Sequence, residues 1–255
     1  MTTYNVMLAK EYKNQNIDDW LMSEKLDGVR AYWTGTELLS RNNKKFYAPE
    51  WFTKDLPKGI KLDGELYQGR GQFQQTCGIV RRHDDQWKGV IFMIFDYIDT
   101  GFDFYRRLDN LKQMKDSNYL PYHCKIVDHL HCKDKNHLKE FQDIIENLGG
   151  EGVMIKNPNS LYQFKRSSDC LKVKSFKQDE CILTGYQDGS GKHTGRVGAF
   201  LCKWNDHDIK LGTGLNDSVR DNPPEIGTTL IFNYFELTEK GVPRFPSFIG
   251  VRDYE

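Results

Sequence analysis

A lysine near the N-terminus stands in a setting that could make it a nucleophile. It lies in the segment Ser23-Glu24-Lys25-Leu26-Asp27-Gly28-Val29-Arg30. A lysine amine attacks only after losing its proton, and other cations in the same pocket favour that loss. Gly28 lets the backbone approach a ligand closely, and Arg30 offers a planar fork suited to a phosphate. The segment therefore predicts attack by Lys25 on an electrophile such as a phosphate, although Lys-x-Asp-Gly alone is more often a surface turn.

Other polar residues would complete such a site, because each interrupts or ends a strand-like segment. They are Asp27, Arg41, Glu65, Glu151, Lys172 and Lys174. The glutamates could hold a ribose hydroxyl or a metal, and the cations could bind phosphates. Phe95 could stack on a base, although an aromatic residue at the end of an apolar run is more often core. Each residue alone fits a solvated strand face, whereas the set as a whole indicates a nucleotide site.

Strands and helices of the first two thirds of the chain must position these residues. Alternating or continuous apolar patterns predict strands and 3.6-residue periodicity predicts helices. The expected strands are 31–33, 37–41, 61–67, 89–96, 151–156 and 171–176, and the expected helices are 104–114 and 138–148. A glycine-rich loop is expected at 68–71, and Lys165-Arg166 is expected in a polar loop.

Beyond residue 176 the pattern changes to short strands separated by glycine-rich turns. The strand-like runs are 180–186, 199–204, 209–211 and 228–235, with one helical turn near 217–220. About five short strands in so small a domain are typical of a barrel of the oligonucleotide-binding (OB) type. The expected fold class is α+β, with one domain at 1–176 and a small OB-fold barrel at 177–255.

Composition sets limits on the class of protein. The chain has 255 residues, of which 38% are hydrophobic and 28% charged, with a net charge of zero. These values indicate a globular protein, and a nucleic-acid-binding surface would have to come from a local basic face. The longest apolar run, 90–95, is too short to span a membrane, and the N-terminus lacks the features of a secretory signal. We therefore expect an intracellular protein with no signal peptide and no membrane association.

The six cysteines are scattered, which in a cytosolic chain predicts reduced thiols. The histidines and cysteines at 123–132 do not follow a common zinc-binding spacing.

The motifs taken together resemble those of a known family. In chain order they match the nucleotidyltransferase motifs of the ATP-dependent DNA ligases, and the tail resembles the last ligase motif on the OB domain. The matching segments are Lys25-Leu26-Asp27-Gly28-Val29-Arg30, Asp63-Gly64-Glu65-Leu66, Phe95-Asp96-Tyr97, Glu151-Gly152-Val153-Met154-Ile155-Lys156, Leu171-Lys172-Val173-Lys174 and the tail 244–252. The arrangement is similar to the minimal two-domain type, of which the chlorella virus ligase is an example, in which a nucleotidyltransferase (adenylation) domain precedes the OB domain.

The resemblance implies a covalent mechanism with ATP as the cofactor. Lys25 would attack the α-phosphate of ATP to give a lysyl-AMP, the AMP would pass to the 5′-phosphate at a nick in duplex DNA, and the 3′-hydroxyl would displace it. Glu65 would hold the ribose, Phe95 and Met154 would flank the adenine, and Glu24 would also bind the nucleotide.

The remaining roles concern metal and phosphate. Glu151 would coordinate Mg²⁺ or Mn²⁺, and Lys172 and Lys174 would bind the α-phosphate, Lys174 also as a catalytic residue. Asp27 would be catalytic by orienting the later steps.

Four arginines complete the implied set. Arg30 and Arg41 would contact the nucleotide or the 5′-phosphate of the DNA, and Arg166 would contact that 5′-phosphate. Arg244 in the tail would assist the first step, when the small domain closes over ATP. The partner would be nicked double-stranded DNA, bound by a monomer.

Two departures from the family pattern stand out. The tail ends Arg252-Asp253-Tyr254-Glu255 without the final lysine common in ligases, which leaves open the residue that orients pyrophosphate. The loop at 188–198 is much shorter than the insertion that latches chlorella-type ligases around DNA, so we expect no latch.

Alternatives to a DNA ligase also remain open. An RNA ligase or an mRNA-capping guanylyltransferase shares the lysine motif and the two-domain plan. A nucleic-acid-binding module with an inactive site is a further alternative, although every motif position carries a competent residue.

Overall fold

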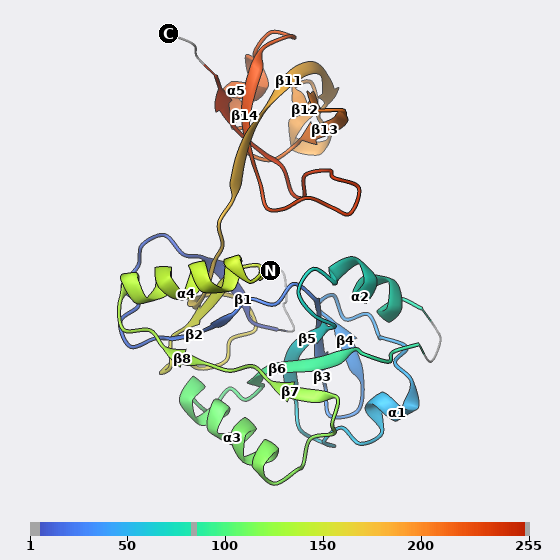
Figure 1. Cartoon of the computed structure of the whole chain (residues 1–255), viewed down its shortest axis with the longest axis vertical. Coiled ribbons are helices and arrows are strands. Elements are labelled where there is room, and N and C mark those ends of the chain that lie inside the picture. The colour runs from blue at the N-terminus through green and yellow to red at the C-terminus, as the bar shows by residue number, and fades with distance from the viewer. Residues whose placement is uncertain (1–5, 83–85, 253–255) are drawn as a thin grey trace. The chain divides into compact units, whose positions relative to one another are not determined.

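The computed structural model describes residues 6–82 and 86–252. The chain divides into two compact units, Met1–Lys174 and Ser175–Glu255 (Figure 1). None of the helices in the described ranges combines the length and the apolarity needed to cross a bilayer.

One five-stranded sheet of the first unit contains β2, the strand that leads into Lys25. Its strand order is β1 (Leu8–Glu11), β10 (Arg166–Val173), β9 (Val153–Lys156), β2 (Leu21–Glu24) and β8 (Leu130–His131). The β1–β10 pair is parallel and the others are antiparallel. Helix α4 (Lys135–Asn147) contacts β9, and its first turn is capped by Asp134, which accepts a hydrogen bond from the His137 amide at 2.8 Å. Because β2 and β9 are neighbours, residues distant in sequence meet at their ends.

A second five-stranded sheet carries the remaining motifs of the first unit. Its order is β4 (Leu38–Ser40), β3 (Val29–Trp33), β5 (Leu62–Tyr67), β6 (Ile91–Tyr97) and β7 (Cys124–Ile126). Helix α3 (Phe104–Asp116) packs on β6 and β7, and the short helices α1 (Glu50–Thr53) and α2 (Phe73–Val80) also belong to this unit. The fully buried Phe52, Trp87, Phe92 and Phe104 lie in its core. Burial of such large aromatic side chains supplies much of the free energy that holds a sheet and its helices together.

Some local expectations differ from the structure. Arg166 begins strand β10 instead of lying in a loop, because the parallel partner β1 supplies the hydrogen bonds that local sequence does not reveal. The expected strand at 171–176 ends at Val173. Helix α2 directly follows the glycine-rich loop and was not expected, since those glycines indicate irregular structure.

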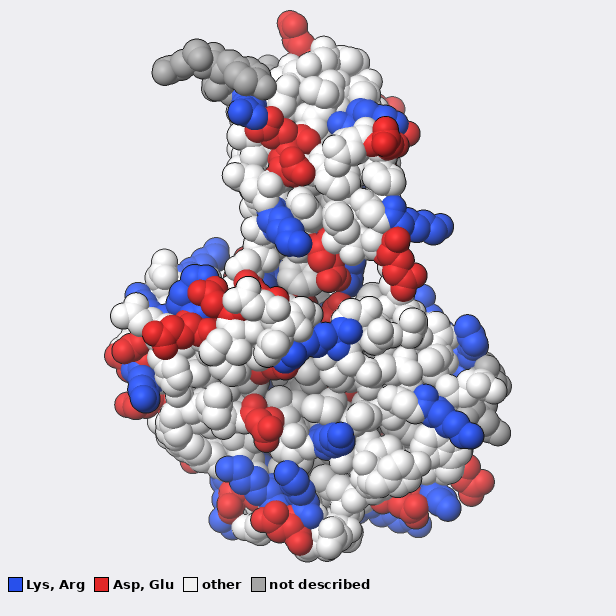
Figure 2. All heavy atoms as spheres, viewed as in Figure 1, with Lys and Arg blue, Asp and Glu red and all other residues white. Residues whose placement is uncertain are grey.

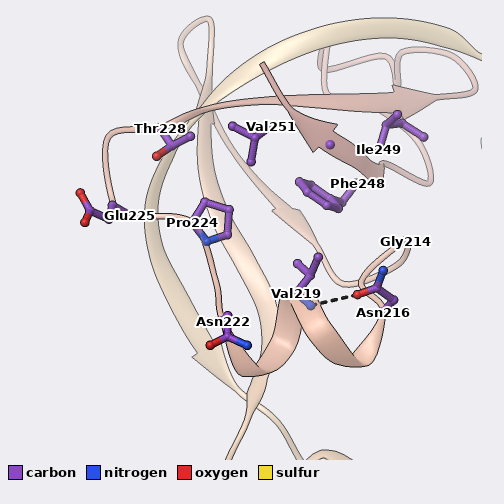
Figure 3. A pocket seen from close by; sticks show the side chains of 11 residues that line it. Gly214, Asn216, Val219, Asn222, Pro224, Glu225, Thr228, Phe248, Ile249 and Val251 are labelled. Atoms are coloured by element: carbon purple, nitrogen blue, oxygen red, sulfur yellow. Dashed lines mark hydrogen bonds between the residues drawn. The ribbon is translucent and has the colours of Figure 1, made fainter. Parts of the chain in front are cut away.

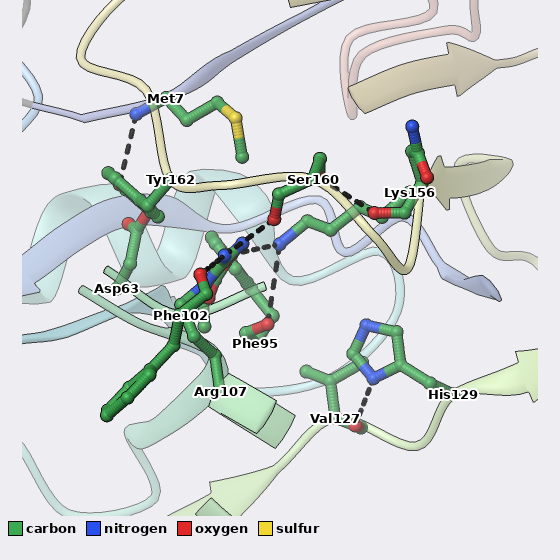
Figure 4. A network of polar contacts seen from close by, with 12 residues as sticks. Met7, Asp63, Phe95, Phe102, Arg107, Val127, His129, Lys156, Ser160 and Tyr162 are labelled. Atoms are coloured by element: carbon green, nitrogen blue, oxygen red, sulfur yellow. Dashed lines mark hydrogen bonds and ion pairs between the residues drawn. The ribbon is translucent and has the colours of Figure 1, made fainter. Parts of the chain in front are cut away.

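Buried charged residues join the two sheets of the first unit (Figure 4). The fully buried Asp96 on β6 accepts from Arg107 Nε on α3 at 2.7 Å and from Lys156 Nζ on β9 at 2.9 Å. Arg107 also donates through Nη1 to the carbonyl oxygens of Phe102 and Ser160, both at 2.8 Å. Burial alone would raise the pKa of Asp96, but Lys156 and Arg107 outweigh it and hold the pKa below its ordinary value. Asp96 is therefore an ionised carboxylate in the core.

A buried histidine beside this cluster carries no charge at neutral pH. His129 Nδ1 donates to the Val127 carbonyl at 2.9 Å, and burial, reinforced by the charge of Lys156, lowers the pKa of His129 to about 3. The histidine thus adds no further positive charge to a cluster that already holds two cations.

The second unit is a small barrel with its own core. Its sheet order is β13 (His207–Leu211), β12 (Val197–Trp204), β11 (Lys177–Asp188), β14 (Thr229–Tyr234) and β15 (Ser247–Val251). A parallel bridge between Thr213 and Ser247 connects the β13 end to β15. Helix α5 (Asp217–Asp221) contacts β12. The expectation of an OB-type barrel is confirmed, while β15 was missed because prolines interrupt the tail pattern before it.

The loop between β11 and β12 is compact in the structure. It contains the 3₁₀ turn η1 (Gly191–His193), and Arg196 at its end pairs with Asp221 through Nε at 2.5 Å and with Asp217 at 3.2 Å. The loop is thereby fixed to α5 of its own unit.

Replacing Asp96 by asparagine should destabilise the chain strongly. The change leaves Arg107 and Lys156 buried without a carboxylate, which typically costs about 3–5 kcal/mol in the free energy of unfolding. Urea unfolding at pH 7 measures this loss. Because the pKa of Asp96 is lowered in the folded state, its stabilising contribution is present above about pH 4 and is lost as the pH falls further. The difference between wild type and variant should therefore shrink in acid.

Asp143→Asn is the matched control. Asp143 pairs with Lys139 on the exposed face of α4, so its loss should change the free energy of unfolding by less than about 0.5 kcal/mol. Equally small effects of the two substitutions would contradict a structural role for the Asp96 cluster.

Candidate active site around Lys25

Lys25 and Glu151 meet where β2 ends and β9 begins. The β2–β9 register places Glu24 opposite Val153, and the Lys25 amide donates to the Gly152 carbonyl at 2.8 Å. The Lys25 ammonium forms an ion pair with Glu151 Oε2, with side-chain exposures of 23% and 9%. At Gly152 φ is +144°, and an added Cβ would lie 2.3 Å from the Val173 carbonyl oxygen. Only glycine fits there, which explains how the glutamate motif approaches the lysine so closely.

A second lysine shares the same carboxylate. Lys174 Nζ lies 3.9 Å from Glu151 Oε1, on the other side from the Lys25 contact. Burial lowers the pKa of Lys174, and Lys25 adds to that effect, while Glu151 opposes it. Burial also raises the pKa of Glu151 despite the nearby Lys25. Two amines thus lie beside one partly desolvated carboxylate, an arrangement that suits a phosphate with developing negative charge.

Glu65 approaches the site from the other sheet. The β3–β5 register places it opposite Arg30, and the backbone at Gly28 passes so near that an added Cβ would lie 2.7 Å from Glu65 Cγ and 2.4 Å from the Leu66 carbonyl oxygen. Burial raises the pKa of Glu65 to about 7, Arg30 and Lys25 oppose the rise, and Glu151 adds to it. The structure therefore brings Glu65 within electrostatic reach of Lys25.

Arg30 is held firmly by an aspartate that the sequence reasoning did not select. Its Nε and Nη2 donate to the two oxygens of Asp63 at 2.7 and 2.6 Å. The guanidinium carbon lies 4.6 Å from the centre of the Phe95 ring, and Lys156 Nζ lies 5.0 Å from the same ring. Asp63 is only 1% exposed, and its place in a strand pattern beside Glu65 was the available signal.

Met154 and Lys172 lie opposite each other on β9 and β10. Met154 is also opposite Ser23 on β2, and it packs partly buried against a core cluster. Lys172 Nζ lies 3.4 Å from Glu11 Oε1 on the edge strand β1. Met154 thus lies on β9, the neighbour of β2, whereas Lys172 lies on β10, one strand farther away.

The carboxylate of Glu24, the residue before the lysine, forms an ion pair with an arginine. Arg70 donates through Nε and Nη2 to the two carboxylate oxygens of Glu24, both at 2.8 Å, and through Nη1 to the Leu148 carbonyl at 3.4 Å. Arg70 was not predicted as a site residue, although glycines on both sides of it indicated an unusual loop. The contact links the loop after β5 to the end of β2.

The remaining predicted residues are placed less closely. Asp27 is partly buried, and its charge raises the pKa of Glu151, so it lies near the pair. Arg41 lies in the exposed turn after β4. Arg166 is exposed at the start of β10 and donates to the Ala9 carbonyl at 2.6 Å. Arg244 belongs to the second unit, where it pairs with Glu236.

Charged side chains of both signs are interspersed on the face of the first unit seen in Figure 2. This face therefore does not present one uninterrupted basic surface.

An open groove lies in the second unit and contains none of the predicted residues (Figure 3). Its volume is about 640 Å³, and it is lined by residues of α5, the following loop and β15, among them Val219, Pro224, Thr228 and Phe248. Several predicted site residues of the first unit gather instead at the strand ends around Lys25, which makes these strand ends the candidate active site.

Comparison with known proteins identifies the same two parts. Residues 6–174 match the model of the ATP dependent DNA ligase domain, and residues 188–252 match that of the DNA ligase OB-like domain. The chain is 38% identical over 245 residues to the DNA ligase of Haemophilus influenzae, covering 96% of this chain and 91% of that protein.

Solved structures agree with the sequence comparison. A Lig E DNA ligase superimposes with a TM-score of 0.89 at 37% identity, covering 97% of this chain and 98% of the other. The chlorella virus DNA ligase-adenylate superimposes with a TM-score of 0.60 at 25% identity, covering 98% and 100%. A family model that spans most of the chain, together with the pairing of Lys25 and Glu151, leads to one conclusion: the chain belongs to the ATP-dependent DNA ligases.

Proposed function

We propose that this ligase seals nicks in duplex DNA by way of AMP bonded to Lys25. The Lys25 amine attacks the α-phosphorus of ATP, a P–N bond forms, and the bond to pyrophosphate breaks. The nick's 5′-phosphate oxygen then takes the AMP from the lysine, and the 3′-hydroxyl displaces AMP to form the phosphodiester bond. The observation that carries the assignment is the position of Lys25, held by Glu151 with Lys174 3.9 Å from that glutamate.

The residues around Lys25 have the chemistry that these steps need. Transfer of a phosphorus group depends on positioning and on charge stabilisation more than on further covalent help. Lys172 and Lys174 are assigned to the α-phosphate, and Asp27 to the orientation of the later steps. The lowered pKa of Lys174 follows from burial, which also strengthens its interaction with an incoming phosphate.

The nucleoside is assigned to residues on both sheets. Glu65 would accept a hydrogen bond from the ribose, and Phe95 and Met154 would flank the adenine. Glu24 would contribute its backbone and its side chain, which Arg70 holds. Because Phe95 lies on β6 and Met154 on β9, the space between these residues depends on the buried contacts between the two sheets.

Mg²⁺ is the cation assigned to the reaction, with Mn²⁺ as a substitute. Magnesium is usually held by one or two carboxylates together with substrate phosphates. No group of three or more metal-ligating side chains occurs in the described ranges, and the single carboxylate of Glu151 beside Lys25 fits this mode. When bound, the cation would shield the charge of the triphosphate.

The second unit and the exposed arginines are assigned to the later steps and to the DNA. Arg41 and Arg166 are exposed and available to a 5′-phosphate. Arg30 is instead held in place by its hydrogen bonds to Asp63. Arg244 is assigned to the first step. We further propose that a monomer binds the nicked duplex and that the short loop at 188–198 does not encircle it. A footprint of that loop extending around the duplex would contradict this.

Family membership favours DNA over the other substrates. An RNA ligase or a guanylyltransferase shares the lysine chemistry, but the matched models are those of DNA ligases in both parts of the chain. Incubation with α-labelled ATP or GTP separates the capping reaction, since only ATP should label Lys25.

Lys25→Ala should abolish adenylation and nick sealing, because it removes the amine assigned as the nucleophile and leaves Lys174, which is assigned to the α-phosphate. Mass spectrometry after incubation with ATP and Mg²⁺ measures the AMP adduct on the intact chain. Lys139→Ala, on the exposed face of α4, is the control and should become adenylated like the wild type. An adduct on the Lys25→Ala chain would mean that the nucleophile is a different residue.

Glu65→Gln should remove a pH dependence of stability. In the unfolded chain Glu65 ionises near its ordinary pKa of 4.5, whereas in the folded chain it ionises near 7. An acid whose pKa is raised in the folded state stabilises the fold at pH values below its ordinary pKa. That contribution is lost as the pH rises to about 7. The urea midpoint of the wild type should therefore fall more between pH 5 and pH 8 than that of the variant. The exposed Glu140→Gln is the control, and an equal slope in all three chains would contradict the burial of Glu65.

A nicked DNA duplex should be sealed with ATP and Mg²⁺, whereas a one-nucleotide gap should be sealed at least roughly 100-fold more slowly. At a nick the 3′-hydroxyl is held next to the adenylated phosphate, and a gap removes that proximity. Gel electrophoresis of labelled strands measures both rates, beside duplexes with RNA in either strand of the nick. Faster joining of RNA ends than of DNA ends would favour the RNA ligase alternative.

A further inference from the structure

Arg30 belongs to a closed ring of hydrogen bonds that includes a buried tyrosine. Arg30 donates twice to Asp63, and its Nη2 also donates to the Met7 carbonyl at 3.1 Å. The Met7 amide donates to the Tyr162 hydroxyl at 3.0 Å, and that hydroxyl donates to Asp63 Oδ2 at 2.5 Å. Figure 4 shows Tyr162 between Met7 and Asp63. The ring connects three separate parts of the chain: the segment before β1, strands β3 and β5, and the loop between β9 and β10.

The ring leaves one edge of the guanidinium available. Nε and Nη2 of Arg30 are used by Asp63 and Met7, and in the part of the chain that the structure describes Nη1 has no hydrogen-bond partner. The Arg30 side chain is 24% exposed, whereas Asp63 and Tyr162 are 1% and 3% exposed. The support is therefore buried while the arginine reaches solvent. A planar guanidinium fixed on two sides presents its remaining N–H groups in one direction.

We propose that Tyr162 is a positioning residue, which acts through Asp63 to aim the Nη1 edge of Arg30 at the phosphate on which the ligase acts. The hydroxyl fixes the Asp63 carboxylate that orients Arg30, and it also fixes the backbone of Met7, whose carbonyl binds the same guanidinium. This role rests on the proposed function, because it assigns the support of one of its phosphate-binding residues. The phosphate is either the α-phosphate of ATP or the phosphate of the nick.

A double-mutant cycle tests the role, with Tyr162→Phe, Arg30→Ala and the two combined. Tyr162→Phe deletes one hydrogen bond to a charged group, so the affected step should slow roughly tenfold. Because the tyrosine acts through the arginine, Tyr162→Phe should have no further effect in the Arg30→Ala chain. Two rates are measured in single turnovers: adenylation by labelled ATP, and sealing of a nick that already carries AMP on its 5′-phosphate. The step that slows identifies the phosphate.

Further variants separate positioning from a general loss of stability. Tyr105→Phe removes a surface hydroxyl bonded to His131 at 3.1 Å and should leave both rates unchanged. Asp63→Asn keeps the shape of the support but removes its charge, so it should slow the same step as Tyr162→Phe and should also be non-additive with Arg30→Ala. Melting temperatures of all chains show whether each is folded at the assay temperature.

The outcomes are distinct. Rate losses from Tyr162→Phe and Arg30→Ala that simply multiply, or a Tyr162→Phe chain as fast as wild type in both steps, would overturn the positioning role alone. A wild-type chain that neither takes up AMP nor seals would overturn the proposed function and this role with it.

Discussion

The buried charge cluster of Asp96, Arg107 and Lys156 is the constraint on which the first unit depends. Asp96 lies on one sheet and Lys156 on the other, so their contact at 2.9 Å links two sheets that each carry part of the candidate site. Such a cluster costs desolvation free energy, and a hydrophobic replacement could be equally stable. Its hydrogen bonds are directional: the Asp96 carboxylate on β6 accepts from Arg107 on α3 and from Lys156 on β9, which restricts how these three elements pack more than apolar contacts would.

Two carboxylates of the candidate site show the opposite balance, since burial raises the pKa of each. Glu151 has a raised pKa despite its pair with Lys25, and Glu65 has a pKa of about 7. Burial therefore opposes the ionisation of both carboxylates at the site. Perturbed groups of this kind cluster at functional sites because incoming charges can compensate them. A bound cation would supply such compensation for the two carboxylates, since positive charge favours their ionised form.

The two units differ in what holds them together. The first combines large aromatic residues with buried ion pairs, whereas the barrel has an apolar core of residues such as Phe200, Phe232 and Phe248. Some charged pairs of the barrel lie at its surface, as in the contact of Arg196 with Asp221, while Arg244 in its pair with Glu236 is largely buried. A barrel closed by strand pairing needs few buried charges, because its backbone groups satisfy one another.

The sequence by itself indicated the family through the resemblance of its ordered motifs, and its strand patterns indicated the two-part fold class, because the pattern within a strand or turn follows local geometry. Gly28 was expected to allow close approach to a ligand, whereas its approach to Glu65, and that of Gly152 to Val173, were known only from the structure. The tertiary structure alone decided which carboxylate meets which cation: Glu151 with Lys25, Asp63 with Arg30, and Glu24 with Arg70. It also revealed Tyr162, which lies 99 residues from Asp63. Periodicity along the chain determines which side chains share a face of a strand. Pairing between distant strands depends instead on which of many possible partners buries the most surface and satisfies the most polar groups. No local pattern encodes that choice.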